Sequence, residues 1–346
     1  MRLERTAVPG RASMRVMESM RDLLAAVPVG ADSGVSVAWA RLGRQVQTAT
    51  RGCAPDDLFQ AGSVSKSVAA AAMLELVDRG RVRLDRPAND ALVHWSLRTS
   101  GGVRSTATVR QLLAHTAGVT VHGFPGYARG ALVPSLDDVL EGRPPAVNEP
   151  VRATPDRAGM FGYSGGGYCV LQRVLTDLTV TTYSAFVRDS VLEPAEMRSA
   201  TYSPDSDGLS LMPGWADGVP LQGGAHTYPE LAAAGMCCTP TDLVRFGLHL
   251  IRSIRHSDPR RSNAFATEMI RPHSTTYALG LELLNLPGHG TVLGHAGSNR
   301  GFKSMFALDA HAGTAAAVMV NDDRATLLSR ATVLGAALQL AVDQTG

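Results

Sequence analysis

Short hydrophobic runs at the two ends of the chain have the length and composition of buried β-strands. One of them, VSVAWA at residues 35–40, lies near the N-terminus. Four more fill the last quarter of the chain, where turn signals separate YALGLELL, GTVLGHAG, GFKSMFALD and GTAAAVMVN. Strands at both ends with helices between them predict one antiparallel sheet built by both termini, with a helical lobe inserted.

Helices are predicted where hydrophobic residues recur at helical spacing. The segment Ser65–Gly80 is apolar on almost every side until Glu75, which is typical of a helix buried in the core, and Gly80 is suited to end it. Further helices are expected near the N-terminus, after Thr108 with a capping box to Gln111, at Tyr168–Thr179, from Pro240 with Thr239 as N-cap, and at Ala325–Val342.

These elements predict an α+β protein that forms a single unit over residues 1–346. Residues 1–80 and 237–346 are expected to form an α/β lobe, and residues 81–236 a mostly helical lobe. The segments 120–158 and 201–234 of the helical lobe are expected to form the walls of a substrate pocket. Within them, VHGFPGYARG at residues 121–130 is interpreted either as a lid or as a cover of the helical lobe.

The composition is that of a soluble globular protein, with 45% hydrophobic and 18% charged residues and a net charge of +2. This small charge gives no reason to expect a nucleic acid or membrane partner, and the basic cluster Ile251–Arg261 is interpreted as a solvated helix end and loop. The four cysteines lack metal-ligand spacing, so no metal or other cofactor is expected. Because no secretory hydrophobic segment appears, the prediction is a cytoplasmic enzyme that acts on a small molecule.

Lysine is rare in this chain, since only Lys66 and Lys303 occur among 33 basic residues. The others are arginines, which cannot be deprotonated in a protein and so cannot act as a base. Lys66 stands three residues after Ser63 at the start of the apolar helix, so the two side chains would face the same way. Burial would lower the pKa of the lysine and let it take the serine proton. The ordinary alternative is a capping serine with a surface lysine, which the apolar neighbours of Lys66 disfavour.

Two hydroxyl groups stand side by side in FGYSGGGY at residues 161–168. Ser164 fits the G-x-S-x-G pattern of a nucleophile elbow, which requires a strand running into it. The residues before it contain two prolines and several charges, which make a poor central strand and favour Tyr163 as the working hydroxyl. Taken alone, Tyr163 could also be a packing residue of a glycine-rich loop.

The segment GHAGSNRGF at residues 294–302 is rich in small residues and lies between two predicted strands. Glycine lets a backbone approach a ligand closely, and main-chain N–H groups left free there could bind an oxyanion. His295 on its own is more often a packed or surface histidine than a catalytic one. A fourth segment, AHTAG at residues 114–118, is interpreted as a structural turn that ends a helix on Gly118.

The order and spacing of these segments are more specific than any one of them. FQAGSVSKS, LLAHTAGV, FGYSGGGYCVLQ, AAAGMCCTPTDLVRFGLHL and GHAGSNRGF together resemble the penicillin-recognising serine hydrolases. The resemblance covers residues 59–309 and is strongest to the class C β-lactamase-related branch, which includes esterases and D-aminopeptidases. It implies a β-lactamase/transpeptidase-like fold and a reaction that passes through an acyl-enzyme.

The resemblance also implies a role for each matching residue. Ser63 would be the acylated nucleophile, Lys66 the lysine that deprotonates and orients it, and Tyr163 the proton relay. The backbone N–H groups of Ser63 and Ser298 would form the oxyanion hole.

Two departures from the pattern of β-lactamases limit the function that can be carried over. Tyr-x-Asn is replaced by Tyr163-Ser164-Gly165, and Lys-Thr-Gly by His295-Ala296-Gly297. Gly165, His295 and Gly297 are thus the substrate-binding candidates. Gly165 lacks the side-chain amide of the asparagine, and His295 lacks the fixed positive charge of the lysine. Arg300 or Lys303 could restore positive charge nearby.

The predicted function is therefore hydrolysis of an ester or small amide with weak or no β-lactamase activity. The alternatives are acyl transfer in biosynthesis on the same fold, an α/β-hydrolase that uses Ser164, and a non-catalytic binding protein.

Overall fold

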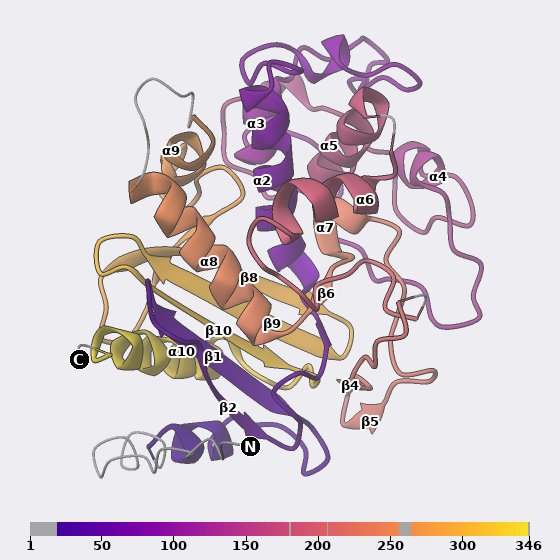
Figure 1. Ribbon diagram of the computed structural model, residues 1–346. Coiled ribbons are helices and arrows are strands. Elements are labelled where there is room, and N and C mark those ends of the chain that lie inside the picture. The colour runs from indigo at the N-terminus through magenta and orange to yellow at the C-terminus, as the bar shows by residue number, and fades with distance from the viewer. Residues whose placement is uncertain (1–18, 180, 206, 256–263, 345–346) are drawn as a thin grey trace, which may run out of the picture.

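The computed structural model describes residues 19–179, 181–205, 207–255 and 264–344, and its centre is a six-stranded antiparallel sheet (Figure 1). The strand order is β2-β1-β10-β9-β8-β7. The strands are β1 (Val35–Arg41), β2 (Gln47–Arg51), β7 (Glu282–Asn285), β8 (Thr291–Asn299), β9 (Phe302–Asp309) and β10 (Thr314–Val320). Because β1 pairs with β10, with Val35 opposite Val320, the predicted sheet from both ends of the chain is confirmed.

Helices cover the sheet and also occur in the inserted residues 81–236, where loops and turns make up more of the described chain than helices do. They are α2 (Ser65–Asp78), α3 (Val109–Leu113), α4 (Leu136–Glu141), α5 (Gly165–Leu178), α6 (Tyr183–Val187), α7 (Leu231–Ala234), α8 (Pro240–Arg255), α9 (Ala264–Ile270) and α10 (Leu327–Val342). The shorter elements are the helical turns η1 (Gly62–Val64), η2 (Ala88–Asp90), η3 (Pro155–Arg157) and η4 (Arg188–Leu192), with strands β3 (Phe59–Gln60), β4 (Trp215–Ala216), β5 (Val219–Pro220) and β6 (Cys237–Cys238). Residues 19–25 are helical, whereas the earlier part of the predicted N-terminal helix and the second half of the basic cluster 251–261 lie outside the described residues.

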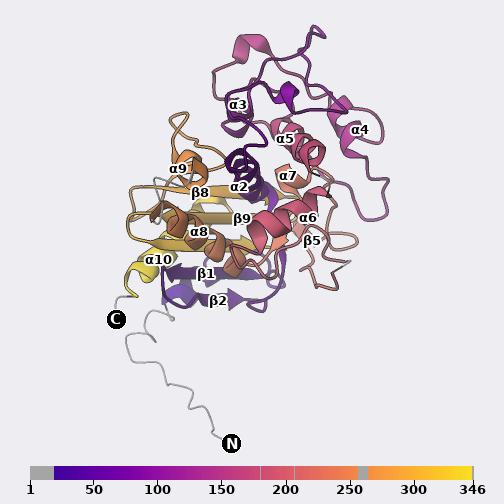
Figure 2. The same ribbon diagram turned by 45° about the horizontal axis from the view of Figure 1, so that its top comes forward.

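Both faces of the sheet are buried. Alternate side chains of β9 and β10 point to opposite faces, so Met305 and Val318 pack with α10 while Phe306 and Met319 pack on the other side. Figures 1 and 2 show α10 against one face and α8 against the other. β10 can approach α8 closely because it contains three successive alanines and because a Cβ at Gly247 would lie only 2.9 Å from the Cβ of Ala315.

The helix α2 lies between the sheet and the helices α3, α4 and α5 (Figure 2). Ala69 to Ala72 are completely buried, which confirms the prediction of a core helix that is apolar all round. Gly80 has a φ of 67° just beyond the helix end, as expected for the glycine that follows a helix.

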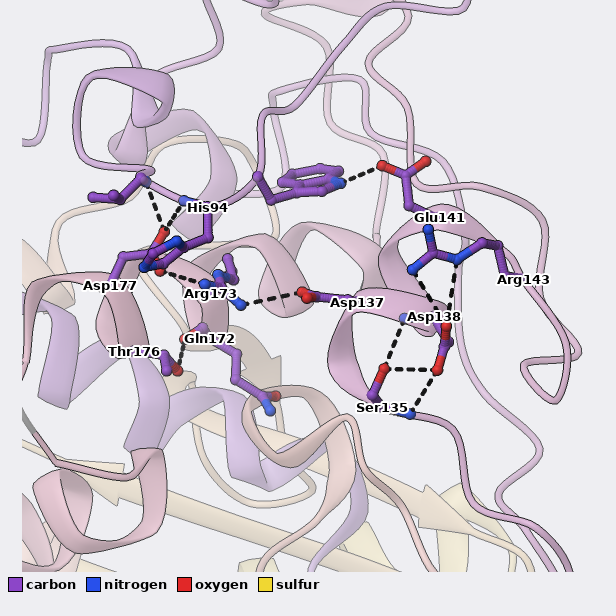
Figure 3. A network of polar contacts seen from close by, with 12 residues as sticks. His94, Ser135, Asp137, Asp138, Glu141, Arg143, Gln172, Arg173, Thr176 and Asp177 are labelled. Atoms are coloured by element: carbon purple, nitrogen blue, oxygen red, sulfur yellow. Dashed lines mark hydrogen bonds and ion pairs between the residues drawn. The ribbon is translucent and has the colours of Figure 1, made fainter.

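A network of charged side chains joins α4 to α5 in the helical lobe (Figure 3). The Arg173 guanidinium on α5 donates to Asp137 over 3.1 Å and to Asp177 over 2.6 Å. Asp177 in turn accepts from the backbone N–H of Val93 (2.7 Å). Arg173 and Asp177 are one helical turn apart, so the pair both supports α5 and ties it to neighbouring segments of the lobe.

Two predicted elements begin at clearly different residues in the structure. The strand expected over YALGLELL covers only Glu282–Asn285, because the preceding residues form a tight turn in which Ala278 N–H donates to Leu281 O (2.8 Å). The helix expected from Tyr168 begins at Gly165, because the Ser164 hydroxyl caps it by accepting from Gly167 N–H (2.9 Å). The turn after α3 places His115 (φ 57°), as well as Gly118 (φ 64°), in the left-handed region. The capping box from Thr108 to Gln111 is confirmed.

Candidate active site

Ser63 lies in the turn η1, which leads directly into α2. The turn is fixed by side chains on both sides, since the Ser304 hydroxyl donates to Ala61 O and the Ser65 hydroxyl to Gly62 O, each over 2.7 Å. Ser63 itself is only half-buried. Its hydroxyl therefore lies at the N-terminal end of a 14-residue helix, where the helix dipole favours developing negative charge.

Lys66 lies one turn further along and faces Ser63. Its side chain is buried, its Nζ lies 3.0 Å from Ser63 Oγ, and it donates to Ala233 O over 2.8 Å. Burial lowers the pKa of Lys66 to about 7, because the charged ammonium is poorly solvated there. A substantial fraction of this lysine is therefore neutral near pH 7 and able to accept a proton.

Tyr163 completes this group from the residue before the N-cap of α5. Its hydroxyl lies close to that of Ser63, and its ring centroid lies 4.9 Å from the Nζ of Lys66. Burial raises the pKa of the Tyr163 hydroxyl above its usual range, and the nearby Ser63 hydroxyl opposes this shift. The structure thus brings together the three side chains that the sequence singled out, from two separate helices.

Ser164 points away from this group. It is 1% exposed, and its hydroxyl donates to Thr120 O (2.7 Å) while capping α5. No strand of the described residues leads into it, and the sheet is antiparallel. The interpretation of Ser164 as the elbow nucleophile of an α/β-hydrolase is therefore wrong.

The end of β8 lies against the turn that carries Ser63. A Cβ at Gly62, which has a φ of 53°, would lie 2.7 Å from the amide nitrogen of Ser298. A Cβ at Gly297 would lie 2.1 Å from Ala61 O, so this glycine is required by contact with the chain itself. The two glycines allow the backbone of Ser298 to lie beside the backbone that precedes Ser63.

His295 is buried in β8 and is neutral. Its Nδ1 donates to Ala296 O over 2.6 Å, and because a carbonyl can only accept, Nε2 must accept from the Tyr277 hydroxyl over 2.9 Å. Burial lowers the pKa of the imidazole, although the nearby Glu282 carboxylate opposes this. His295 has no exposed surface, so it supplies no fixed positive charge at the position where β-lactamases carry lysine.

Sequence reasoning missed Tyr277, the hydrogen-bond partner of His295, because it lay in a predicted strand and belonged to no motif.

Gly165 begins α5 beneath the segment of residues 121–130. Its N–H donates to His122 O over 2.9 Å, and a Cβ there would lie 2.9 Å from the ring of Phe124. The ring of His122 also lies against that of Tyr163, with 5.1 Å between centroids. Phe124 therefore occupies the space into which a larger side chain at position 165 would extend.

Lys303 and Arg300 do not add positive charge beside Ser63. Lys303 lies on the face of β9 opposite Ser304, the residue that contacts the Ser63 turn, and it donates to Ser298 Oγ over 2.6 Å. Arg300 binds Asp217 over 3.0 Å. Strand alternation directs the Lys303 side chain to the face of the sheet that α10 covers, away from Ser63. The structure therefore does not support the expectation that Lys303 or Arg300 restores positive charge beside the nucleophile.

Two cavities lie in the segments expected to form pocket walls. One of about 300 Å³ borders Tyr163 and is lined by Val119, Thr120, Met160 and Phe161 among others. The other, of about 510 Å³, lies between residues 202–211 and 223–229 and reaches Gln60, three residues before Ser63. Gln60 accepts from the side chain of Asn299 over 2.9 Å, so this cavity adjoins the end of β8.

In the part of the chain that the structure describes, no cluster of three or more histidine, cysteine, aspartate or glutamate side chains could hold a metal ion. The same residues include no helix with the length and hydrophobicity needed to span a membrane.

The comparisons with known proteins agree with this architecture. The model of the Beta-lactamase family matches residues 22–339. Penicillin-binding protein 4 of Amycolatopsis lactamdurans is 25% identical over 306 residues, which cover 78% of this chain and 74% of that protein. Esterase EstB of Burkholderia gladioli is 34% identical over 99 residues, or 29% of this chain and 25% of the esterase. Among solved structures, D-amino acid amidase from Ochrobactrum anthropi SV3 has a TM-score of 0.73 at 21% identity, and the match covers 96% of this chain and 99% of the amidase.

The fold and the family match define the class of protein. The chain belongs to the Beta-lactamase family and has the β-lactamase/transpeptidase-like fold of the penicillin-recognising serine hydrolases. The predicted superfamily and fold are thereby confirmed, and the protein is a serine hydrolase.

Proposed function

We propose that the protein hydrolyses an ester or small amide through an acyl-enzyme on Ser63. The observation that carries this proposal is the distance of 3.0 Å between Lys66 Nζ and Ser63 Oγ, with a buried lysine whose pKa is about 7. A serine hydroxyl becomes a good nucleophile only when a neighbouring group takes its proton. Neutral Lys66 donates to Ala233 O and keeps its lone pair for that proton.

The reaction begins when Ser63 Oγ attacks the carbonyl carbon of the substrate and its proton passes to Lys66 Nζ. The oxyanion that forms would be bound by the N–H groups of Ser63 and Ser298, which the glycines at 62 and 297 bring close together. As the tetrahedral intermediate collapses to the acyl-enzyme, Tyr163 gives its hydroxyl proton to the leaving group and takes the proton held by Lys66 in its place. In the second half, water attacks the acyl carbon and gives a proton to Tyr163 and Lys66. The same proton passes to Ser63 Oγ as its bond to the acyl group breaks, which releases the carboxylic acid and restores the hydroxyl.

Weak or absent β-lactamase activity follows from the two departures in the motifs. The neutral, buried His295 offers no cation for the carboxylate of a β-lactam, and Gly165 offers no amide. The cavity beside Tyr163, with Met160 and Phe161 in its wall, would receive an apolar group of the substrate. The esterase and amidase named among the similar proteins support the same substrate classes.

The test is a panel of p-nitrophenyl esters, D-amino acid amides and β-lactams, with turnover measured for each compound. We expect esters and amides to be turned over and β-lactams to be hydrolysed at least about 100-fold more slowly, as expected when a site lacks a charged contact for the substrate. Fastest turnover of a β-lactam would contradict this assignment. Product analysis with added alcohols or amines would show how much of the acyl group is transferred instead of hydrolysed. The cytoplasmic location stays a prediction of the sequence.

A further inference from the structure

His115 follows α3, lies beside Tyr163 and has no part in the steps described above. It is 2% exposed, and its φ of 57° lies in the left-handed region that residues other than glycine seldom adopt. A residue stays in such a conformation only where its surroundings hold it firmly. The contacts that hold it lead to Tyr163.

His115 binds the backbone on both sides of Tyr163. Its carbonyl oxygen accepts from the N–H of Gly162 over 2.8 Å, and its Nδ1 accepts from the N–H of Ser164 over 3.1 Å. One residue thus binds the N–H groups of the two residues that flank the tyrosine. Because Nδ1 accepts a hydrogen bond, the neutral ring carries its proton on Nε2. Burial lowers the pKa of this imidazole well below its usual value, which agrees with a neutral ring.

The ring of His115 also packs directly against that of Tyr163. Their centroids lie 4.3 Å apart with 37° between the planes, and the ring centroid of Tyr277 lies 4.7 Å from that of the same imidazole. Nε2 has no hydrogen-bond partner among the described residues, so the imidazole acts on its neighbours through Nδ1 and its face. With Lys66 Nζ 4.9 Å from the centroid of the Tyr163 ring, the tyrosine ring lies close to both the lysine and the histidine.

We propose that His115 is the positioning residue of Tyr163, holding the tyrosine hydroxyl beside Ser63 through the N–H groups of Gly162 and Ser164 and through the ring contact. This inference rests on the proposed function, in which Tyr163 moves protons at Ser63. His115 acts through the tyrosine and exchanges no proton itself. A displacement of about 1 Å of a reacting group can reduce a rate about 100-fold, so positioning of this kind is measurable.

Two substitutions separate the imidazole from the backbone conformation. His115→Gly permits the left-handed φ and keeps the carbonyl bond to Gly162, but it removes the Nδ1 acceptor and the ring. His115→Asn also tolerates a left-handed φ and places an amide oxygen where Nδ1 accepts from Ser164. We expect kcat to fall about 100-fold in H115G with KM changed less than about threefold, and H115N to recover most of the loss.

The decisive control is the same substitution in a Tyr163→Phe background. If His115 acts through the tyrosine hydroxyl, H115G has little further effect on kcat once that hydroxyl is gone. An equal loss in both backgrounds, or no recovery in H115N, would overturn the proposal, because a merely structural role would lower activity regardless of residue 163.

Crystal structures of the two variants give a readout that does not depend on activity. We expect the Tyr163 hydroxyl to leave Ser63 in H115G and to stay there in H115N. A tyrosine in its original place in H115G would overturn the proposal. If Tyr163 moves in H115G but the unmodified protein forms no acyl-enzyme at Ser63, the proposed function fails while the positioning role of His115 stands.

Discussion

The Nζ of Lys66 lies 3.0 Å from Ser63 Oγ and 2.8 Å from the carbonyl oxygen of Ala233, inside a buried environment. This relationship predicts a definite pH dependence. Burial lowers the pKa of Lys66 to about 7, and only the neutral amine can accept the serine proton, so the acylation rate should rise with pH through about 7 and then level off.

Lys66→Met should remove this rise together with most of the activity. We expect acylation to fall by about 1,000-fold, as for loss of a general base, while the apolar substitute is accommodated in the buried site. The measurement is the rate of nitrophenol release from an activated ester at pH values on both sides of the lysine pKa of about 7. A variant that keeps both the rate and the rise near pH 7 would show that another group serves as the base.

Gly62→Ala should close the space between the Ser63 turn and Ser298. Its Cβ would lie 2.7 Å from the Ser298 nitrogen, so the backbones must separate and the proposed oxyanion hole is disturbed. We expect kcat to fall about 100-fold, as when an oxyanion donor is lost. Gly43→Ala is the matched control, since Gly43 also has a positive φ, of 81°, but a Cβ there meets nothing within 4 Å. Equal losses of activity in the two variants would contradict the role assigned to this contact.

Glu230 should make the protein less stable at alkaline pH. It is completely buried, neither carboxyl oxygen has a hydrogen-bond partner among the described residues, and burial raises its pKa to about 7. Because the folded-state pKa lies above the unfolded one, the stabilising contribution is fully present below about pH 4 and is lost as the pH rises through about 7.

Glu230→Gln removes the titrating group with little change in shape. Between about pH 5 and pH 8 the unmodified protein should lose about 3 kcal/mol of unfolding free energy that the variant does not lose. Urea unfolding at the two pH values measures this difference, and Glu193→Gln, at an exposed position, is the control. A pH dependence unchanged by E230Q would contradict the assignment.

Asp322 ties the N-terminal part of the chain to the end of β10. Its buried carboxylate accepts from Gly30 N–H (3.0 Å), the Ser33 hydroxyl (2.7 Å) and the Arg324 guanidinium (2.7 Å). Although burial alone would raise the pKa of Asp322, these donors hold it well below the usual range, so the stabilisation is present above about pH 4 and is lost as the pH falls.

Asp322→Asn should lower the unfolding free energy by about 3 kcal/mol at neutral pH, because it leaves these donors and the Arg324 backbone N–H without their charged acceptor. Urea unfolding measures the loss. Asp56→Asn, at an exposed position, should change the unfolding free energy by less than about 0.5 kcal/mol, and equal effects of the two substitutions would refute this account.

The sheet and the group around Ser63 could be predicted because their signals are local or ordered along the chain. The apolar runs define β1 and β10, and the i, i+3 spacing on one helix is sufficient to place Lys66 beside Ser63. The position of Tyr163 followed from the resemblance to a known family rather than from spacing. These predictions needed no knowledge of how distant segments pack.

The contacts that the sequence did not reveal depend on the tertiary structure. The sequence around His115 is that of an ordinary helix end. Its hydrogen bond to Ser164 could not be predicted, because the two residues are 49 positions apart in the sequence. The burial of His295 beside Tyr277 likewise depends on a tight turn before β7 that was predicted as strand. Strand alternation places Lys303 and Ser304 on opposite faces of β9, but the sequence does not reveal which of the two faces the nucleophile occupies.

The most direct test of the central claim is to locate the acyl group or probe on the chain. The protein is treated with a fluorophosphonate or an activated ester, its intact mass is measured, and the labelled peptide is sequenced by mass spectrometry. We predict one adduct, on Ser63, which is abolished in Ser63→Ala and retained in Ser164→Ala. Labelling that survives Ser63→Ala, or that is lost only in Ser164→Ala, would contradict the account.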